Sequence, residues 1–511
     1  MFVYRNFRPS KLTSLLVVLL LTSIHLHNSQ AQNSKHEMRG IWVATVSNID
    51  WPSSNSLKSK TQKREAIELL NHVKSLGFNT IFLQVRPTTD ALYYSSLEPW
   101  SSVLTPVAGQ APKPFYDPLQ FWIDEAHQRG IELHAWINPY RAAMNADTPL
   151  PDNHPAIAHP EWFLTYGGKL YFDPGQPASK HHINKVVKEI IKNYEVDGIH
   201  MDDYFYPYPI AGIEFPDSLS YNKYGKANFP DNKDDWRREN VNQTIESLYQ
   251  TIKTEKPWVA FGISPFGVWR NQADDPRGSD SRAGATNYDH LYADIMKWME
   301  NGWMDYVAPQ IYWETSHPAA NFVKLAQWWN DNNYETPVFI GHSTYKIGSD
   351  KPDWQTPQQM PQQFRIGRSL PNINGNISFS YKHFKRDLLG FQDSLANHLF
   401  NTVALPPAYE LKPQTTPDNP IIKIKATGRR VKWKLEKSSQ KENYRYVIYS
   451  YAPNQQPDYN DPSLIVDITG LRKYKFIKRK NGKRTVNYIR VSTIDKNRRE
   501  SRPSAPVRVK L

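Results

Sequence analysis

The spacing of apolar and polar residues changes between two periods along residues 38–399. Short apolar, β-branched runs predict buried strands, and longer stretches with apolar residues three and four positions apart predict helices. The predicted strands are Met38–Val46, Thr80–Arg86, Ile131–Asn138, Gly198–Tyr204, Trp258–Pro265, Tyr306–Trp313, Pro337–His342 and Asn376–Tyr381. The predicted helices are Lys60–Leu76, Pro118–Arg129, Lys180–Tyr194, Trp236–Lys253, Tyr292–Asn301, Ala320–Asn330, Pro357–Ile366 and Lys385–Leu399. Strands that alternate with helices eight times predict an α/β chain folded as a (β/α)₈ TIM barrel. A doubly wound open sheet is the alternative, but it rarely needs eight units and no Gly-rich nucleotide loop is present.

The last hundred residues follow a different pattern, with short alternating strands and turn residues between them. The predicted strands are Lys423–Lys425, Arg430–Leu435, Tyr444–Tyr451, Ser463–Thr469, Tyr474–Arg479, Thr485–Thr493 and Val507–Leu511. Seven strands in this length predict a small all-β sandwich of the immunoglobulin or fibronectin kind. A proline-rich stretch at 405–420 predicts a stiff linker. We therefore expect a barrel at 32–404 and a β-sandwich at 421–511.

The first 31 residues resemble a secretory signal peptide. Arg5, Arg8 and Lys11 precede the apolar run Leu15–Leu21, and Ser29-Gln30-Ala31 offers a cleavage site after Ala31. The apolar run is shorter than the roughly 20 residues that cross a bilayer. The absence of cysteine excludes a lipidated cysteine, disulfides and thiolate chemistry. We expect an exported protein, in the periplasm or outside the cell, without a stable membrane anchor.

Charge divides the chain unequally. Residues 409–511 carry 25 Lys and Arg against 9 Asp and Glu, whereas residues 32–408 have a net charge of −6. A strongly basic module fits contact with an anionic cell-envelope surface, although it fits a merely solvated face equally well. Nucleic acid is not expected as a partner, because no nucleic-acid-binding pattern accompanies the charge and the chain is predicted to be exported.

Polar residues gather where the predicted strands end, which is where barrel enzymes carry their active sites. The candidate substrate-binding residues are Arg86, Asp90, Trp136, Asn138, Tyr140, Arg141, His200, Tyr204, Gln310, Tyr312 and Trp313. Sixteen Trp, 29 Tyr and 21 Phe supply many flat faces of the kind on which sugar rings stack, although aromatic side chains also fill cores.

The fourth strand ends in adjacent carboxylates, Asp202 and Asp203. Two carboxylates can divide into acid and base when their environments separate their pKa values, and glycoside hydrolysis uses such a pair. Strand alternation predicts that these two point to opposite faces, so a partner from another strand is expected. Glu314 is the candidate, as a general acid whose pKa aromatic burial would raise, with Asp90 as the alternative. The candidate catalytic residues are thus Asp202, Asp203 and Glu314.

Metal chemistry is the competing mechanism. His200 with Asp202, or His181 and His182, could bind a hydrolytic metal, but no established ligand spacing is present. We therefore expect no catalytic metal and no cofactor.

Five ordered motifs resemble the bacterial glycosyl-hydrolase-like family ten. They are MRGIWVAT at 38–45, QVRP at 84–87 followed by DALY at 90–93, AWINPYR at 135–141, DGIHMDDYFYP at 197–207 and APQIYW at 308–313. The resemblance covers about Glu37–Leu399 and implies a TIM-barrel hydrolase of the cell envelope, whose strand-four acidic pair maps to Asp202 and Asp203. One member is similar to a peptidoglycan glycosidase that cleaves glycan strands stripped of their peptides, while most members have no assigned substrate.

The favoured hypothesis is a glycoside hydrolase that acts on a cell-wall or extracellular glycan. A catalytically inactive carbohydrate-binding barrel and a metal-dependent polysaccharide deacetylase remain alternatives. The sequence leaves open the sugar, the linkage, the stereochemistry, the second carboxylate and the oligomeric state.

Overall fold

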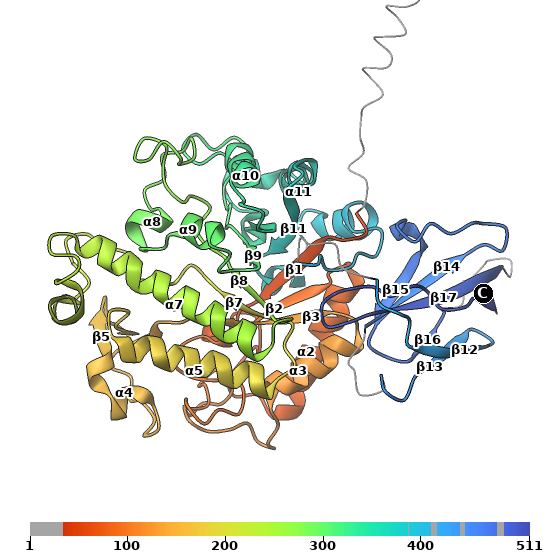
Figure 1. Cartoon of the computed structure of the whole chain (residues 1–511), viewed down its shortest axis with the longest axis horizontal. Coiled ribbons are helices and arrows are strands. Elements are labelled where there is room, and N and C mark those ends of the chain that lie inside the picture. Colours follow the sequence, from red (N-terminus) through yellow and green to blue (C-terminus); the bar gives the residue numbers. More distant parts are fainter. Residues whose placement is uncertain (1–33, 387, 410–415, 440–444, 478–484) are drawn as a thin grey trace, which may run out of the picture.

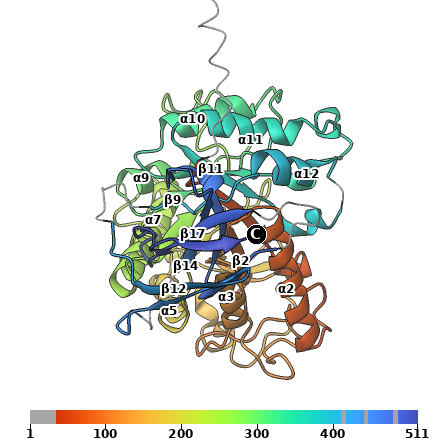
Figure 2. The same ribbon diagram turned by 90° about the vertical axis from the view of Figure 1, so that its right-hand side faces the viewer.

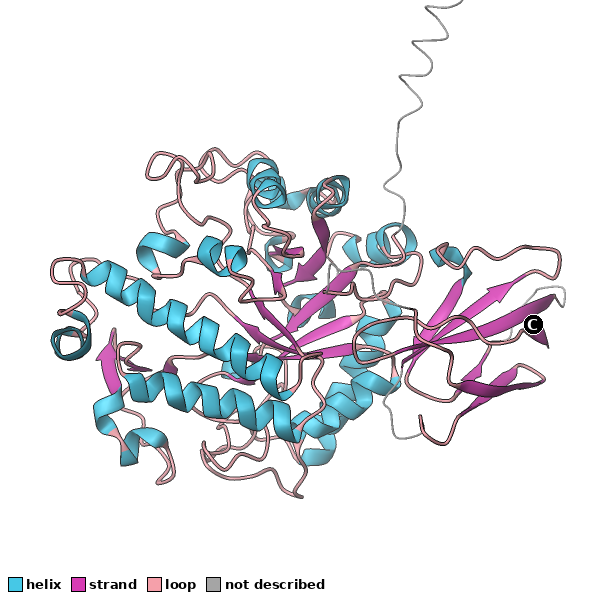
Figure 3. Cartoon of the chain, in the orientation of Figure 1, coloured by secondary structure: helices cyan, strands magenta, loops and turns pink. Residues whose placement is uncertain are grey.

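Eight parallel strands close into a barrel surrounded by helices (Figure 1, Figure 3). The computed structural model describes residues 34–386, 388–409, 416–439, 445–477 and 485–511. Around the barrel the strands are ordered β1, β2, β3, β7, β8, β9, β10 and β11, and β11 pairs with β1. They span Met38–Val43, Thr80–Arg86, Glu132–Ile137, Gly198–Met201, Ala260–Ile263, Tyr306–Val307, Val338–His342 and Ile373–Ser378. The TIM-barrel prediction is confirmed. The predicted signal peptide lies outside the described residues.

The main helices cover the outside of the barrel. They are α2 (Ser59–Ser75), α3 (Pro118–Gln128), α5 (Pro177–Asn193), α7 (Lys233–Glu255), α9 (Ile295–Glu300), α10 (Phe322–Asp331), α11 (Gln359–Ser369) and α12 (Phe391–Ser394). Every residue of strands β1, β2 and β3 is buried, because one face packs on the helices and the other fills the barrel. This two-sided burial explains why the sequence shows continuous apolar runs there.

The loops at the carboxyl ends of the strands carry additional elements. After β3, a three-stranded sheet forms from β4 (Arg141–Ala143), β5 (Phe163–Tyr166) and β6 (Lys169–Phe172), with the short helix α4 (Pro155–Ala158). After β7 come α6 (Ser218–Ser220) and a π-helical turn at Tyr221–Gly225, and after β8 comes α8 (Asn287–His290). These insertions build walls around the barrel mouth.

A series of polar side chains in contact with one another, which we call the polar chain, crosses the inside of the barrel. Within the core that includes Trp42, the indole of Trp42 donates to His200 Nε2 at 3.0 Å. The hydroxyl of Tyr306 lies 3.0 Å from His200 Nδ1 and 2.9 Å from His134 Nδ1. His134 Nε2 lies 3.5 Å from Glu132, the first residue of β3. The chain therefore reaches from near the mouth to the opposite end of the barrel.

The C-terminal region forms two antiparallel sheets, seen end-on in Figure 2. One contains β12 (Ile421–Thr427), β13 (Arg430–Leu435) and β16 (Lys473–Lys475). The other contains β15 (Ile465–Thr469), β14 (Arg445–Tyr451), β17 (Val486–Ile494) and β18 (Val507–Lys510). A core that includes Trp433, Ile448 and Val491 lies between the sheets, which confirms the predicted all-β fold.

This β-domain docks on the end of the barrel where the strands begin. Buried Glu132 binds Arg445 at 2.6 Å and Arg498 at 3.0 Å. A Cβ added to Gly130 would lie 2.5 Å from the carbonyl oxygen of Ile468, so the two backbones touch. The linker residue Tyr409 stacks on Tyr306 and closes the barrel floor. The mouth at the other end stays free.

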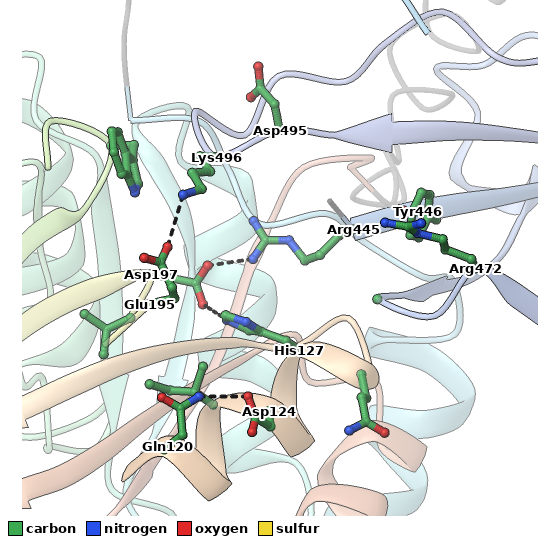
Figure 4. Close-up of a pocket in the computed structure, with 15 residues that line it drawn as sticks. Gln120, Asp124, His127, Glu195, Asp197, Arg445, Tyr446, Arg472, Asp495 and Lys496 are labelled. Carbon is green, nitrogen blue, oxygen red and sulfur yellow. Dashed lines mark hydrogen bonds and ion pairs between the residues drawn. The ribbon is translucent and has the colours of Figure 1, made fainter. Parts of the chain in front are cut away.

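A hollow of about 370 Å³ remains at this junction, shown in Figure 4. Asp197 is held there by Arg445 at 2.8 Å and His127 at 2.7 Å, while Lys496 binds Glu195 at 3.1 Å. The pairs Arg445–Asp197 and Lys496–Glu195 cross the domain boundary, so the hollow is part of the interface. Within the described part of the chain, no helix is both long and apolar enough to cross a bilayer.

Candidate active site

Asp202 and Asp203 directly follow β7 at the mouth of the barrel. Gln310, which follows β9, donates from its Nε2 to Asp202 Oδ1 and to the backbone oxygen of Ser264, at 2.9 Å in each case. The backbone N–H of Asp203 donates to Asp202 Oδ1 at 2.9 Å. Asp203 is 3% exposed and accepts a hydrogen bond of 2.8 Å from the hydroxyl of Tyr208. Asp202 is the more exposed of the two.

The carboxyl groups of Asp202 and Asp203 are close enough that the charge on one affects the protonation of the other. β7 ends at Met201, so the strand alternation on which the prediction of opposite faces depends does not extend to Asp202 and Asp203. Asp202 and Asp203 form one unit that can share a proton.

Burial and mutual repulsion disfavour two charges in this unit. Burial, and then the charge of Asp202, raise the pKa of Asp203 well above its ordinary range. Burial also raises the pKa of Asp202, against the hydrogen bonds from Asp203 and Gln310 and the charge of Arg141. The pair therefore keeps one proton to a higher pH than two separate aspartates would, as an acid catalyst requires.

A pocket of about 330 Å³ lies beside the pair, between the loops that follow β3 and β7. Its wall contains Arg141, Tyr166, Lys169, Tyr171, Tyr204 and Tyr208. The guanidinium of Arg141 lies 4.1 Å from the ring centre of Tyr204. Arg141 is 8% exposed, and no carboxylate among the described residues forms an ion pair with it. The pocket combines flat aromatic faces with an available cation.

Asp90 lies in a second pocket of about 360 Å³, formed by loops after β1, β2 and β3. Its carboxylate accepts a hydrogen bond of 2.7 Å from Thr88, and burial raises its pKa. Trp100 lines the same pocket. Asp90 therefore stays a candidate for a substrate contact or for the second carboxylate.

Glu314 does not have the electrostatics that the sequence predicts. It lies 3.5 Å from Lys351 and is 5% exposed. Burial raises its pKa, but a hydrogen bond from its own backbone and the charges of Lys351 and Lys346 outweigh burial and lower it. The expected rise in the pKa of Glu314 is wrong, because the neighbouring lysines were not foreseen. Its catalytic role stays a prediction.

Several predicted substrate-binding residues are structural instead. Arg86 is 1% exposed, binds Glu98 through Nε at 2.7 Å and Nη2 at 2.6 Å, and donates to backbone oxygens of 138 and 139. Asn138 donates to the Pro87 oxygen at 3.1 Å, and the hydroxyl of Tyr140 donates to Thr244 at 2.9 Å. The polar groups of Arg86, Asn138 and Tyr140 are thus used to hold the loops at the barrel mouth. This corrects the expectation that they contact substrate.

Trp136 and His200 also lie beneath the mouth. The Trp136 indole donates to Asn138 at 3.2 Å, and the side chain is 3% exposed. His200 is fully buried in the polar chain, and burial, then His134, lower its pKa well below the ordinary value. His200 is neutral and has no open side, so the predicted substrate contact is corrected here too. Tyr312 and Trp313 are partly exposed near the mouth, and burial raises the pKa of Tyr312.

Sequence reasoning missed two contributors to the site. Tyr208 follows the acidic pair by five positions and was not among the candidate residues, yet it binds Asp203 directly. Ser264 follows β8 and supplies the oxygen that fixes Gln310, with its own hydroxyl 3.1 Å from His200. The position of Ser264 at a strand end was the available signal. No group of three metal-ligating side chains occurs among the residues that the structure places.

The glycosyl hydrolase-like 10 family model matches residues 37–357, a span that contains the acidic pair and its partners Tyr208 and Gln310. The chain belongs to the glycosyl hydrolase-like 10 family. Among its relatives, this chain is 45% identical to "Glycosyl hydrolase YngK" of Bacillus subtilis over 457 residues, which cover 87% of this chain and 88% of YngK. It is 42% identical to "Glycosyl hydrolase DigH" of Escherichia coli K12 over 373 residues, covering 68% of this chain and 84% of DigH.

Solved glycoside hydrolases also resemble this glycosyl hydrolase-like 10 chain. The glycoside hydrolase domain of PgaB (BpsB) from Bordetella bronchiseptica matches with a TM-score of 0.44 and 12% identity, over 70% of this chain and 98% of that domain. α-L-Fucosidase isoenzyme 2 from Paenibacillus thiaminolyticus matches with a TM-score of 0.45 and 13% identity, over 72% of this chain and 51% of that one.

Proposed function

We propose that this protein is an exported glycoside hydrolase that cleaves peptidoglycan glycan strands, with Asp202 and Asp203 as its proton-carrying unit. The observation that supports this most is the pair of adjacent carboxyl groups at the barrel mouth, because burial raises the pKa of both and the charge of Asp202 raises that of Asp203 further. Acid catalysis needs a carboxyl group that is still protonated near neutral pH.

In the proposed reaction, the pair gives its proton to the glycosidic oxygen as the bond to the anomeric carbon breaks. Asp202, the more exposed member, faces the substrate, and Asp203 holds the second position of the shared proton. Water adds its hydroxyl to the anomeric carbon, and its remaining proton restores the pair. One water molecule is consumed and two sugar ends are released.

A second carboxylate is required if the reaction follows the usual two-carboxylate course. Asp90 and Glu314 come from loops after β2 and β9 and are the candidates. The lowered pKa of Glu314 suits an ionised base or nucleophile better than an acid. Asp90→Asn and Glu314→Gln, assayed beside Asp202→Asn, will separate them.

The pocket of about 330 Å³ between the loops after β3 and β7, which we call the tyrosine pocket, supports a preference for anionic sugars. Arg141 and Lys169 line it together with five tyrosines. Glycan strands stripped of their peptides carry free carboxylates on alternate sugars, and a buried guanidinium that forms no ion pair with a described carboxylate suits such a group. Sugar rings would stack on the tyrosines beside it.

The test is turnover of purified glycan strands, with and without peptides, by the wild type and by Asp202→Asn. We expect new reducing ends from the wild type on peptide-free strands and a loss of about 10³-fold in the variant. Binding without turnover by the wild type would favour the inactive carbohydrate-binding barrel. Release of acetate without new reducing ends, abolished by a chelator, would favour the deacetylase alternative.

A further inference from the structure

The outer face of the three-stranded sheet β12–β13–β16 is almost entirely basic. Its inner positions pack into the sandwich core, among them Val431, Trp433 and Leu435. Its outward positions are exposed and comprise Lys423, Lys425, Thr427, Arg430, Lys432, Lys434, Lys473 and Lys475. Seven of these eight residues are Lys or Arg, so we call this surface the basic face.

The cations of the basic face lie directly opposite one another. Lys425 pairs with Lys432, which pairs on its other side with Lys473. Lys423 faces Lys434, and Arg430 faces Lys475. Opposed residues in antiparallel strands have their Cβ atoms about 5 Å apart, where like charges destabilise the sheet. A face of this kind opposes folding, and an anionic partner would remove that opposition.

Nothing in the described residues neutralises this face from within the protein. None of its seven cations forms an ion pair with a described carboxylate, although the chain forms many such pairs elsewhere. The nearest acid along these strands is Glu436, one residue beyond the end of β13. β14 and β15 of the opposite sheet pack on Leu405 of the linker, and the basic face is the outer surface on the other side of the sandwich.

Two exposed isoleucines flank the basic face. Ile477, which follows β16 two residues after Lys475, is 88% exposed. Ile422, at the irregularity that begins β12, is 63% exposed. A soluble polyanion gains little from contact with such side chains. A bilayer buries them at its headgroup boundary while its phosphates meet the lysines.

We propose that the basic face binds the surface of an anionic lipid bilayer, with Ile422 and Ile477 inserted at the headgroup level. A flat sheet with cations in rows matches a plane of phosphates, and no exposed aromatic lies among its eight outward positions to stack on nucleic-acid bases. This association is peripheral and depends on salt, because charge supplies much of it.

The experiment measures co-sedimentation of the full chain without residues 1–31 with phosphatidylcholine vesicles that contain about one third phosphatidylglycerol or none. We expect binding only to the anionic vesicles at low salt. Lys425→Glu/Lys432→Glu/Lys473→Glu should weaken it about tenfold or more. Lys60→Glu/Lys113→Glu/Lys226→Glu changes the net charge equally at exposed barrel positions and should stay within about twofold.

Ile422→Ser/Ile477→Ser keeps every cation and separates a bilayer from a soluble polymer. We expect weaker vesicle binding with unchanged retention on polyglycerol phosphate. Equal vesicle binding by the two charge-reversed triple variants would overturn the proposal. The proposal would also be overturned if the wild type bound polyglycerol phosphate but not the anionic vesicles. That outcome would assign the basic face to a wall polymer. Far-UV circular dichroism of each variant checks that the chain is folded.

Discussion

The hydroxyl of Tyr208 donates a hydrogen bond of 2.8 Å to the carboxylate of Asp203. This bond stabilises the ionised form of Asp203 and so opposes the rise in pKa that burial and Asp202 cause. Tyr208 comes from the loop after β7 and also lines the tyrosine pocket. One side chain thus connects the pocket lined by Arg141 and the tyrosines with the acidic pair.

Removing that hydroxyl should move the alkaline limb of the pH–rate profile. Tyr208→Phe deletes a bond that lowers the pKa of Asp203, so the pair keeps its proton to higher pH. We expect the alkaline midpoint of kcat to rise and kcat itself to fall by about tenfold or less. Tyr94→Phe, at an exposed tyrosine, is the control and should leave the profile unchanged.

Gln310→Leu should move the acidic limb instead. Gln310 donates to Asp202, and this bond lowers the pKa of Asp202. Without it the second proton binds the pair at a higher pH, so activity should already decline at a pH where the wild type is fully active. A profile shifted only at its alkaline limb would contradict the assignment. Both limbs report macroscopic pKa values of the pair.

The two aspartates should differ in the severity of their asparagine variants. Asp202→Asn removes the carboxyl that faces the substrate and should reduce kcat about 10³-fold. Asp203→Asn leaves Asp202 in place and should reduce kcat about 10²-fold, with the alkaline limb moved to lower pH because the raised pKa is lost. Equal losses and unmoved limbs in both variants would indicate that the pair does not share a proton.

Glu132→Gln should loosen the junction between the domains. The substitution leaves Arg445 and Arg498 buried without their carboxylate partner, which costs about 3–5 kcal/mol of unfolding free energy. Urea denaturation will measure it. Glu195→Gln is the control at the same junction, where the 41% exposed Glu195 side chain pairs with Lys496, and should cost less than about 1 kcal/mol.

Arg86→Met should destabilise the barrel without a selective effect on substrate binding. Burial opposes the charge of Glu98, but Arg86 and His182 outweigh burial and lower the pKa of Glu98 to about 2. The stability from this pair is complete above the ordinary pKa of 4.5 and is lost as the pH falls through about 2. We expect a loss of about 3–5 kcal/mol at neutral pH and a nearly unchanged KM.

The barrel strands were predictable because burial on both faces leaves a continuous apolar signal, and β2 has the predicted bounds, Thr80–Arg86. The positions at which the strands end, on their carboxyl side, were less predictable. The predicted strands continue past Met201 and Val307, but the backbone there leaves the sheet to form the mouth. That departure brings Asp202 and Asp203 together against the strand alternation. The same cause brings Gln310 to Asp202.

The pattern of apolar and polar residues could not predict which side chains form ion pairs with one another in the folded chain. Arg86 and Glu98 are close in sequence, but nothing in their spacing shows that both are buried and paired. Lys351, which binds Glu314, comes from a loop after β10 whose path depends on the whole barrel. The acidic pair itself was identifiable, because adjacent carboxylates after a buried strand are a local signal.

The polar chain inside the barrel has a fixed direction. The indole of Trp42 can only donate, so His200 Nε2 accepts and a neutral His200 carries its hydrogen on Nδ1. That hydrogen faces the oxygen of Tyr306, whose own hydrogen is then directed to His134 Nδ1. His134 must carry its hydrogen on Nε2, toward Glu132. The two histidines are therefore opposite tautomers, set by a pure donor at one end and a pure acceptor at the other, and nitrogen chemical shifts would distinguish them.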